Sequence, residues 1–230
     1  MYSLYLFDLD GTLVDTAPEI TDATNALLAS ARLPQVDEAL VRQWIGHGTR
    51  ELLAQAVAHV SGRAVDILRG DGTLDALMPA FSLHYLEHCG RRSRVYPQVE
   101  AALDGLRDRG ARLAVITNKE ERFAFPLLER HGLRDYFQLV VCGDTLPAKK
   151  PDPMPITHCL KRFSVSAAQA VFVGDSEIDV KTARAAGVAC WAVPYGYNHG
   201  RPIQSAGPDR VIESFAELVE QPERRLLLID

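Results

Sequence analysis

The sequence lacks the features that mark several large classes of protein. It has no apolar run close to the roughly 18 residues that a membrane-spanning helix needs, and its N-terminus lacks the charged and then apolar pattern of a secretory signal. We therefore expect a cytoplasmic protein without a membrane partner. Its net charge of −5, and the absence of a basic stripe interleaved with aromatic residues, argue against a nucleic-acid partner.

Cysteine is also sparse, and no CxxC pair occurs. The four cysteines are Cys89, Cys142, Cys159 and Cys190, two of which lie inside apolar runs. A thiol in such a run behaves as a small hydrophobic side chain. We therefore expect reduced, structural cysteines and no zinc site, because the Cys and His spacing does not approach the paired pattern of such sites.

What the sequence does contain is a series of short apolar runs, at 3–7, 112–116, 137–141, 170–173 and 190–193. They are of strand length and do not alternate with polar residues, which is typical of strands buried on both faces. Helix-like segments separate the last four, for example 120–131 and 178–186. Strand, helix and strand in series predict an α/β fold with a parallel sheet and right-handed crossovers.

A segment of about eighty residues interrupts this alternation of strands and helices. Helical periodicity without a strand signal covers 17–32, 37–45, 49–60 and 74–89. We therefore predict a discontinuous α/β core, formed by residues 1–14 and 96–230, and an inserted helical domain at 15–95. Two linkers, near residues 15 and 95, would permit hinge motion between them.

Polar residues follow each of the first four apolar runs. Asp8 and Asp10 follow the first, Thr117 and Asn118 the second, Lys150 comes after the third, and Asp175 and Asp179 follow the fourth. In an open parallel sheet, ligands bind outside the carboxyl ends of the strands. We therefore expect these side chains to converge on one site.

Carboxylates that converge in this way repel one another. Two like charges 4 Å apart repel by about 4 kcal/mol at an effective dielectric constant of 20. Either some of the acids are protonated or a divalent cation lies among them, and all-oxygen ligands favour Mg²⁺ over zinc or copper. Each motif alone could be a turn or a helix N-cap, but their joint occurrence favours a site.

At these residues the chain resembles the haloacid dehalogenase superfamily over nearly its whole length. Its DxDGT motif is matched by Asp8 to Thr12, its Thr or Ser by Thr117, its lysine by Lys150, and its GDxxxD motif by Gly174 to Asp179. The resemblance implies a Rossmann-like parallel-sheet core, with the helical insertion as a cap domain.

The resemblance also implies roles in phosphoryl transfer. Asp8 would attack phosphorus and form an aspartyl phosphate, and Asp10 would act as general acid and then as general base. Thr117 and Asn118 would donate hydrogen bonds to phosphoryl oxygens, and Lys150 would neutralise charge. Magnesium would be held by the side chain of Asp8, by the main-chain carbonyl of Asp10 and by Asp175. Asp179 would be a further ligand or would lie next to a ligand.

Several branches of the superfamily fit less well. Dehalogenating members lack the second aspartate, which is Asp10 here. Phosphonate-cleaving members use a lysine in the cap, and residues 16–95 contain none. Sugar-phosphate mutases share the aspartate pair, so the motifs alone do not exclude that activity. A protein of a different class, a non-catalytic sensor of phosphoryl ligands, would have the same sheet but would not catalyse a reaction.

More narrowly, the stretches WIGHGTRELL, AKKPDP and VPYGYNHGRPI resemble the phosphoglycolate phosphatase family. This implies a small phosphorylated metabolite as partner, 2-phosphoglycolate first of all. His47 and Arg50 could receive its carboxylate, or could belong to a structural helix junction. Phosphatases of N-acetylmuramate 6-phosphate, pyrophosphate or nucleotides would share the same core. Both a monomer and a homodimer are compatible with the sequence.

Overall fold

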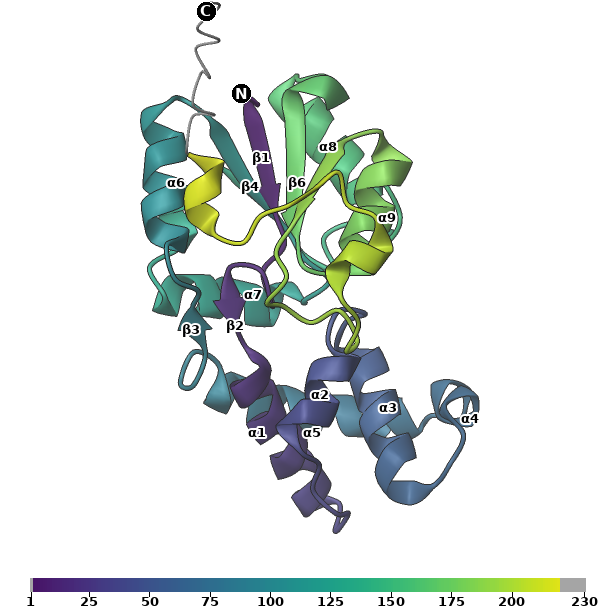
Figure 1. The fold of residues 1–230 in the computed structure, drawn as a ribbon. Helices are drawn as coiled ribbons and strands as arrows, with labels where there is room; N and C mark the ends of the chain where they lie inside the picture. The colour runs from purple at the N-terminus through teal and green to yellow at the C-terminus, as the bar shows by residue number, and fades with distance from the viewer. Residues whose placement is uncertain (1, 220–230) are drawn as a thin grey trace, which may run out of the picture.

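The computed structural model describes residues 2–219. A six-stranded sheet lies at its centre, with all neighbouring strands parallel and in the order β5-β4-β1-β6-β7-β8 (Figure 1). The strands are β1 (Leu4–Phe7), β4 (Arg112–Ile116), β5 (Leu139–Val141), β6 (Ala170–Gly174), β7 (Ala189–Ala192) and β8 (Arg210–Val211). The predicted parallel α/β fold is therefore confirmed.

Helices cover both faces of this sheet. Along β1, Tyr5 and Phe7 pack into one apolar cluster with α6 (Val99–Asp108) and α7 (Glu121–Arg130). Leu4 and Leu6 pack into another with α8 (Met154–Phe163) and α9 (Glu177–Ala186). Because successive side chains of a strand point to opposite faces, a strand buried on both must be apolar throughout. That requirement explains the non-alternating runs.

The predicted strand bounds agree closely with the structure, with one informative exception. The run at 112–116 forms β4 over the same residues, whereas the run at 137–141 pairs only from Leu139. Residues 134–136 form a single turn of 3₁₀ helix, which carries the chain into the sheet edge. The two-residue β8 was not predicted, since so short a strand has no periodicity to detect.

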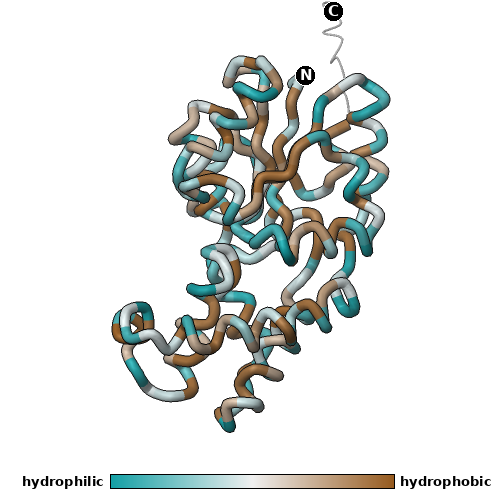
Figure 2. Tube along the Cα trace, turned by 180° about the vertical axis from the view of Figure 1, so that it is seen from behind, coloured by the Kyte–Doolittle hydropathy of each residue, from teal (hydrophilic) through white to brown (hydrophobic). Residues whose placement is uncertain are grey.

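Five helices lie together beyond the carboxyl ends of the strands, where β1 points in Figure 1. This helical layer consists of α1 (Ala17–Ser30), α2 (Glu38–Trp44), α3 (Thr49–Ser61), α4 (Val65–Gly70) and α5 (Thr73–His88). Its helices share an apolar cluster that also includes Phe123 of α7 and Tyr197, and hydrophobic and hydrophilic residues alternate along the helices in Figure 2. The short α4 was not predicted.

Two short strands connect the helical layer with the sheet. β2 (Val14–Asp15) pairs antiparallel with β3 (Arg94–Val95), so the chain leaves and returns side by side. Next to this ribbon, the fully buried Glu19 of α1 accepts hydrogen bonds from the backbone N–H groups of Gly90 (2.7 Å) and Ser93 (3.2 Å). A buried acceptor with two backbone donors fixes α1 against the returning chain.

The four cysteines are buried and free, as predicted. Within residues 2–219, no helix combines the length and the apolar character that crossing a bilayer requires. The expectation of a cytoplasmic location stays a prediction.

The Glu19 contact can be tested by substitution. Glu19→Ala leaves the buried N–H of Ser93 and the partly buried N–H of Gly90 without this acceptor and should lower the free energy of unfolding by about 1–3 kcal/mol. Glu19→Gln keeps a carbonyl oxygen there and should lose less. Urea denaturation at equilibrium measures both variants, and an Ala variant as stable as wild type would show that this contact contributes nothing.

Candidate active site

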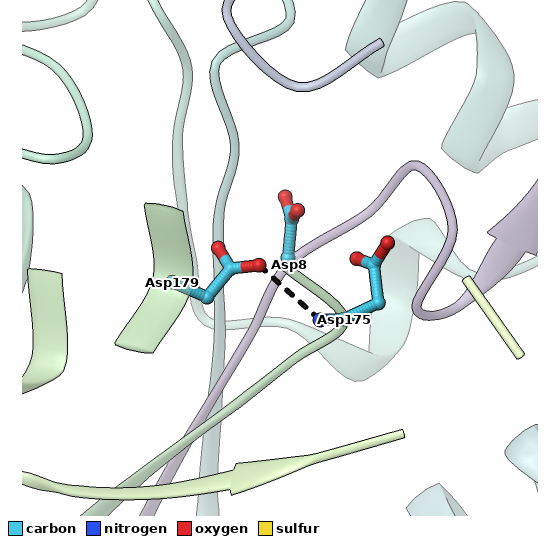
Figure 3. A group of neighbouring side chains, drawn as sticks. All are labelled: Asp8, Asp175 and Asp179. Carbon is cyan, nitrogen blue, oxygen red and sulfur yellow. Dashed lines mark hydrogen bonds between the residues drawn. The ribbon is translucent and has the colours of Figure 1, made fainter. Parts of the chain in front are cut away.

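Three buried carboxylates meet at the carboxyl edge of the sheet. Asp8 follows β1, Asp175 follows β6, and Asp179 lies in the first turn of α9. Each offers an oxygen within 4.8 Å of the others, and Figure 3 shows the three carboxyl groups on the same side of the chain. The adjacency of β1 and β6 in the sheet produces this cluster, since Phe7 and Val173 pair just before the two aspartates.

Lys150 lies between two of these acids. Its Nζ is 2.7 Å from Oδ1 of Asp8 and 2.7 Å from Oδ1 of Asp179, and the side chain is almost fully buried. Burial alone would lower the pKa of Lys150, but the two carboxylates outweigh it and the pKa is raised. The ammonium therefore stays charged, and it offsets part of the repulsion within the cluster.

Asp179 is fully engaged by the protein. Oδ1 accepts from Lys150, and Oδ2 accepts from the backbone N–H groups of Asp175 (3.2 Å) and Ser176 (3.0 Å) and from the Ser176 hydroxyl (2.6 Å). The Ser176 side chain and Asp179 form the capping box of α9. The position of Asp179 therefore suits holding Lys150 and the loop after β6 in place.

Asp175 is held by the two loops that flank it. Its oxygens accept hydrogen bonds from the hydroxyl of Thr12 (2.7 Å) and the backbone N–H of Tyr197 (2.5 Å). Gly11 passes close by at φ +84°, and a Cβ there would lie 2.5 Å from Oδ2 of Asp175. Close approach to Asp175 thus explains this glycine.

Burial and nearby negative charges disfavour the charged forms of Asp8 and Asp175. Burial raises the pKa of Asp8 to about 7, against the lowering effect of Lys150. Burial, followed by the charges of Asp179 and Asp8, raises the pKa of Asp175 well above its usual value. Acids whose pKa is raised by burial and by like charges are typical of sites that bind a cation or carry out proton chemistry.

The donor set fits magnesium. Three carboxylates and one ammonium leave two negative charges in the cluster, which a divalent cation would neutralise. All of the donors are oxygens, the ligands that Mg²⁺ prefers. Among the described contacts of Asp8, none engages Oδ2, so this oxygen is available to a ligand.

Asp10 faces the same site with different partners. Its Oδ1 accepts from Nζ of Lys119 (2.8 Å) and from the hydroxyl of Thr16 (2.7 Å), so the strand-end segment and the start of α1 meet at this carboxylate. Sequence reasoning singled out neither partner. The signal for Lys119 was its place directly after Thr117 and Asn118, at a strand end that was already predicted to be functional.

A small cavity opens onto Asp8 and Asp10. Its described lining comes partly from the strand ends and partly from the helical layer: Asp8, Asp10, Ile20, Ile45, Gly46, Gly48, Thr49, Leu52, Phe81, Tyr85, Thr117, Asn118 and Lys119. The centre of a water molecule can move through about 40 Å³ of it. The cavity therefore suits a small ligand with one polar and one apolar side.

Thr117 and Asn118 both reach this cavity but differ in their contacts. The Thr117 hydroxyl accepts only a long hydrogen bond from the backbone N–H of Lys119 (3.2 Å), so its own proton can be donated. The Asn118 side chain donates to the carbonyls of Gly46 (2.9 Å) and Lys150 (3.0 Å), which joins the helical layer to the loop that carries Lys150.

The predicted carboxylate receptors lie elsewhere. Neither His47 nor Arg50 is among the described residues that line the cavity, and both line a separate, wider cleft. Arg50 is exposed and forms a salt bridge with Asp75, while the ring of His47 stands 5.1 Å from that of His199. Their role in substrate binding stays a prediction, and in this arrangement they form part of the helix junction.

Asp15, the third acid of the N-terminal segment, also points away from the cluster. It forms a salt bridge with Arg42 of α2 (3.1 Å) and accepts from the hydroxyl of Tyr197. That hydroxyl in turn accepts from the backbone N–H groups of Thr16 (2.9 Å) and Ala17 (3.0 Å), at the beginning of α1. Asp15 and Tyr197 therefore fasten the helical layer to the core.

The fold and this site agree with a comparison against protein families. Residues 5–193 match the model of the haloacid dehalogenase-like hydrolases, so the chain belongs to that family. The match extends from β1 to just beyond β7 and therefore includes the acid cluster, Lys150 and the helical layer.

Individual relatives are similar over almost the whole chain. A phosphoglycolate phosphatase of Nitrosococcus oceani is 39% identical, over 94% of each chain. Phosphoglycolate phosphatase 1 of Pseudomonas aeruginosa is 43% identical, over 94% of this chain and 78% of that protein. The crystal structure of a predicted phosphoglycolate phosphatase from Haemophilus somnus superposes with a TM-score of 0.87 at 34% identity, and the match covers 95% of this chain and 96% of that one.

Magnesium should stabilise the protein through the acid cluster. At a concentration a hundred times its dissociation constant, a ligand of the folded state adds about 2.7 kcal/mol, or roughly 5–10 °C in Tm for a chain of this size. Asp175→Asn should lose most of this rise in a thermal melt. Asp66→Asn, at an exposed site in α4, is the control; equal rises in all three proteins would contradict a site at Asp175.

Proposed function

We propose that the protein is a magnesium-dependent phosphatase of small phosphate monoesters, which converts 2-phosphoglycolate to glycolate and phosphate. The observation that carries the proposal is the buried cluster of Asp8, Asp175 and Asp179, bridged by Lys150 and open to a cavity of small volume. The choice of substrate rests on relatives near 40% identity that are named phosphoglycolate phosphatase.

In this proposal the chain has two functional parts. Residues 1–14 and 96–230 form the catalytic core, of which residue 1 and residues 220–230 lie outside the described part of the chain, and residues 15–95 form a cap domain. The contribution of Ile20, Leu52 and Tyr85 to the cavity supports the assignment, because these side chains come from α1, α3 and α5 and would exclude water from the reacting groups. The β2–β3 ribbon would serve as the hinge.

Asp8 is the nucleophile in the first step. Lys150 binds its Oδ1 and leaves Oδ2 free to attack phosphorus. An oxygen–phosphorus bond forms to Asp8 while the bond from phosphorus to the alcohol oxygen breaks, which gives an aspartyl phosphate and the alcohol. The Thr117 hydroxyl, the neighbouring backbone and Lys150 would bind the phosphoryl oxygens as charge shifts among them.

Asp10 moves the protons in both steps. It gives a proton to the leaving alkoxide, and it then takes one from the water that attacks the aspartyl phosphate, which releases phosphate and restores Asp8. The hydrogen bonds from Thr16 and Lys119 fix the direction in which its carboxyl group points.

Magnesium, when bound, would neutralise charge on the phosphoryl group and on Asp8. Asp8, the main-chain carbonyl of Asp10 and Asp175 would hold it. Because both oxygens of Asp179 already accept hydrogen bonds from the protein, its proposed role is to orient Lys150 and the loop after β6.

The alternatives make different predictions about products. A sugar-phosphate mutase would interconvert its substrates with little net release of phosphate, and a non-catalytic sensor would bind phosphate esters without turnover. Phosphatases of N-acetylmuramate 6-phosphate, pyrophosphate or nucleotides would release phosphate from those compounds first. A panel of all these substrates, assayed for phosphate with and without Mg²⁺, therefore separates the candidates.

Asp8→Asn should abolish phosphate release from 2-phosphoglycolate. Loss of an active-site nucleophile lowers turnover by roughly 10⁴-fold or more, because the remaining groups can bind the ester but cannot attack it. Steady-state assays measure the loss, and a thermal melt checks that the variant is folded. Full turnover by the folded variant would mean that Asp8 is not the nucleophile.

Asp10→Asn should slow the reaction to a degree that depends on the leaving group. With 2-phosphoglycolate, loss of the general acid should cost about 10²–10⁴-fold. With p-nitrophenyl phosphate, whose leaving group needs no proton, the first step should survive while hydrolysis of the intermediate is slow. Stopped-flow assays should then show a burst of nitrophenolate, and equal losses for both esters without a burst would contradict the assignment.

A further inference from the structure

Lys119 is a buried cation that the chemistry proposed above uses only to orient Asp10. It is only 6% exposed, it lines the cavity, and its Nζ lies beside Asp10 and Tyr85, which line the cavity too. Among the described residues that line the cavity, it is the only one with a positive charge. A cation is seldom buried without a task, because removing it from water is costly unless its partners compensate.

The partners of Lys119 within residues 2–219 leave part of the ammonium free. Its one side-chain hydrogen bond runs to Oδ1 of Asp10 (2.8 Å), and the centroid of the Tyr85 ring lies 4.7 Å from Nζ. An ammonium group carries three N–H donors. Donor capacity therefore remains for an anion in the cavity.

The position of Lys119 relative to Asp10 indicates which part of a substrate would reach it. Asp10 would hand its proton to the oxygen that bridges phosphorus and the alcohol carbon. In 2-phosphoglycolate the carboxylate carbon is two bonds from that oxygen, so it must lie beside Asp10 on the side away from phosphorus. Nζ of Lys119 is at hydrogen-bond distance from the same carboxyl group.

The surroundings would make such a contact selective. Ile20, Leu52 and Phe81 supply apolar walls, where a charge–charge hydrogen bond is stronger than in water. An ammonium at this position can bind the carboxylate of a substrate while it stays in contact with Asp10.

We propose that Lys119 is the specificity-determining residue of the site and binds the carboxylate of small acidic phosphate esters while it remains in contact with Asp10. This inference rests on the proposed function and names the group that selects the substrate. It replaces His47 and Arg50 in that role, since those side chains face the separate cleft.

The test compares two esters that differ only in the carboxylate. 2-Phosphoglycolate and ethyl phosphate share the bridging oxygen and the carbon chain length, but ethyl phosphate ends in a methyl group. The ratio of their kcat/KM values isolates recognition of the carboxylate, because any effect of a variant on Asp10 acts on both esters. Wild type should favour 2-phosphoglycolate strongly, and Lys119→Met should lower the ratio by roughly 10- to 100-fold, mainly through KM.

Two matched variants locate the effect. Nζ of Lys149 donates to the carbonyl of His47 (2.8 Å), and Lys149 lines the separate cleft. Lys149→Met should therefore leave the ratio of the two kcat/KM values at its wild-type level. Arg50→Gln tests the competing receptor. A ratio that falls in Arg50→Gln and holds in Lys119→Met would overturn the inference.

The remaining outcomes are also decisive. If wild type hydrolyses neither ester, the proposed function fails and the inference with it. If wild type prefers 2-phosphoglycolate and Lys119→Met keeps the same ratio, only the inference fails. Should Lys119→Met not fold, Lys119→Arg takes its place: its longer, planar head should raise KM several-fold for 2-phosphoglycolate alone, and equal changes for both esters would overturn the role.

Discussion

The arrangement of the site depends on one buried ammonium group between two carboxylates. Nζ of Lys150 lies 2.7 Å from both Asp8 and Asp179, and burial raises the pKa of Asp8. Without this charge, the three carboxylates would meet at the sheet edge with no described cation paired to any of them. With it, and with all three acids ionised, two negative charges remain, which a divalent cation would neutralise so that an anionic phosphate ester is no longer repelled.

The sheet brings these charges together through its strand order. β1 lies between β4 and β6, so the loops that carry Asp8, Thr117 and Asp175 leave the sheet side by side. The backbone N–H of Asp8 donates to the carbonyl of Val173, and that of Thr117 donates to the carbonyl of Val141. Each polar residue therefore lies directly after the last paired residue of its strand. The apolar strands are held by packing on both faces, and this rigidity lets polar groups be buried at their tips.

Much of this could be predicted from the sequence, because the strands and the acids after them leave local signals. The run at 112–116 and the aspartates at 8, 10, 175 and 179 are examples. The contacts of Lys119 and Glu19 could not be predicted, since each depends on a partner far away in the chain. His47 and Arg50 are a different case: a Gly-flanked basic pair suggested a binding role, both residues line another cleft, and that role stays a prediction.

Tyr197 gives the molecule a mechanical property. Its backbone N–H donates to Asp175, while its hydroxyl accepts from the first N–H groups of α1 and donates to Asp15. This one residue thus connects an acid of the cluster to the first helix beyond the ribbon. A tilt of α1 would have to break these bonds or displace Asp175, so the position of α1 and the alignment of Asp175 are coupled.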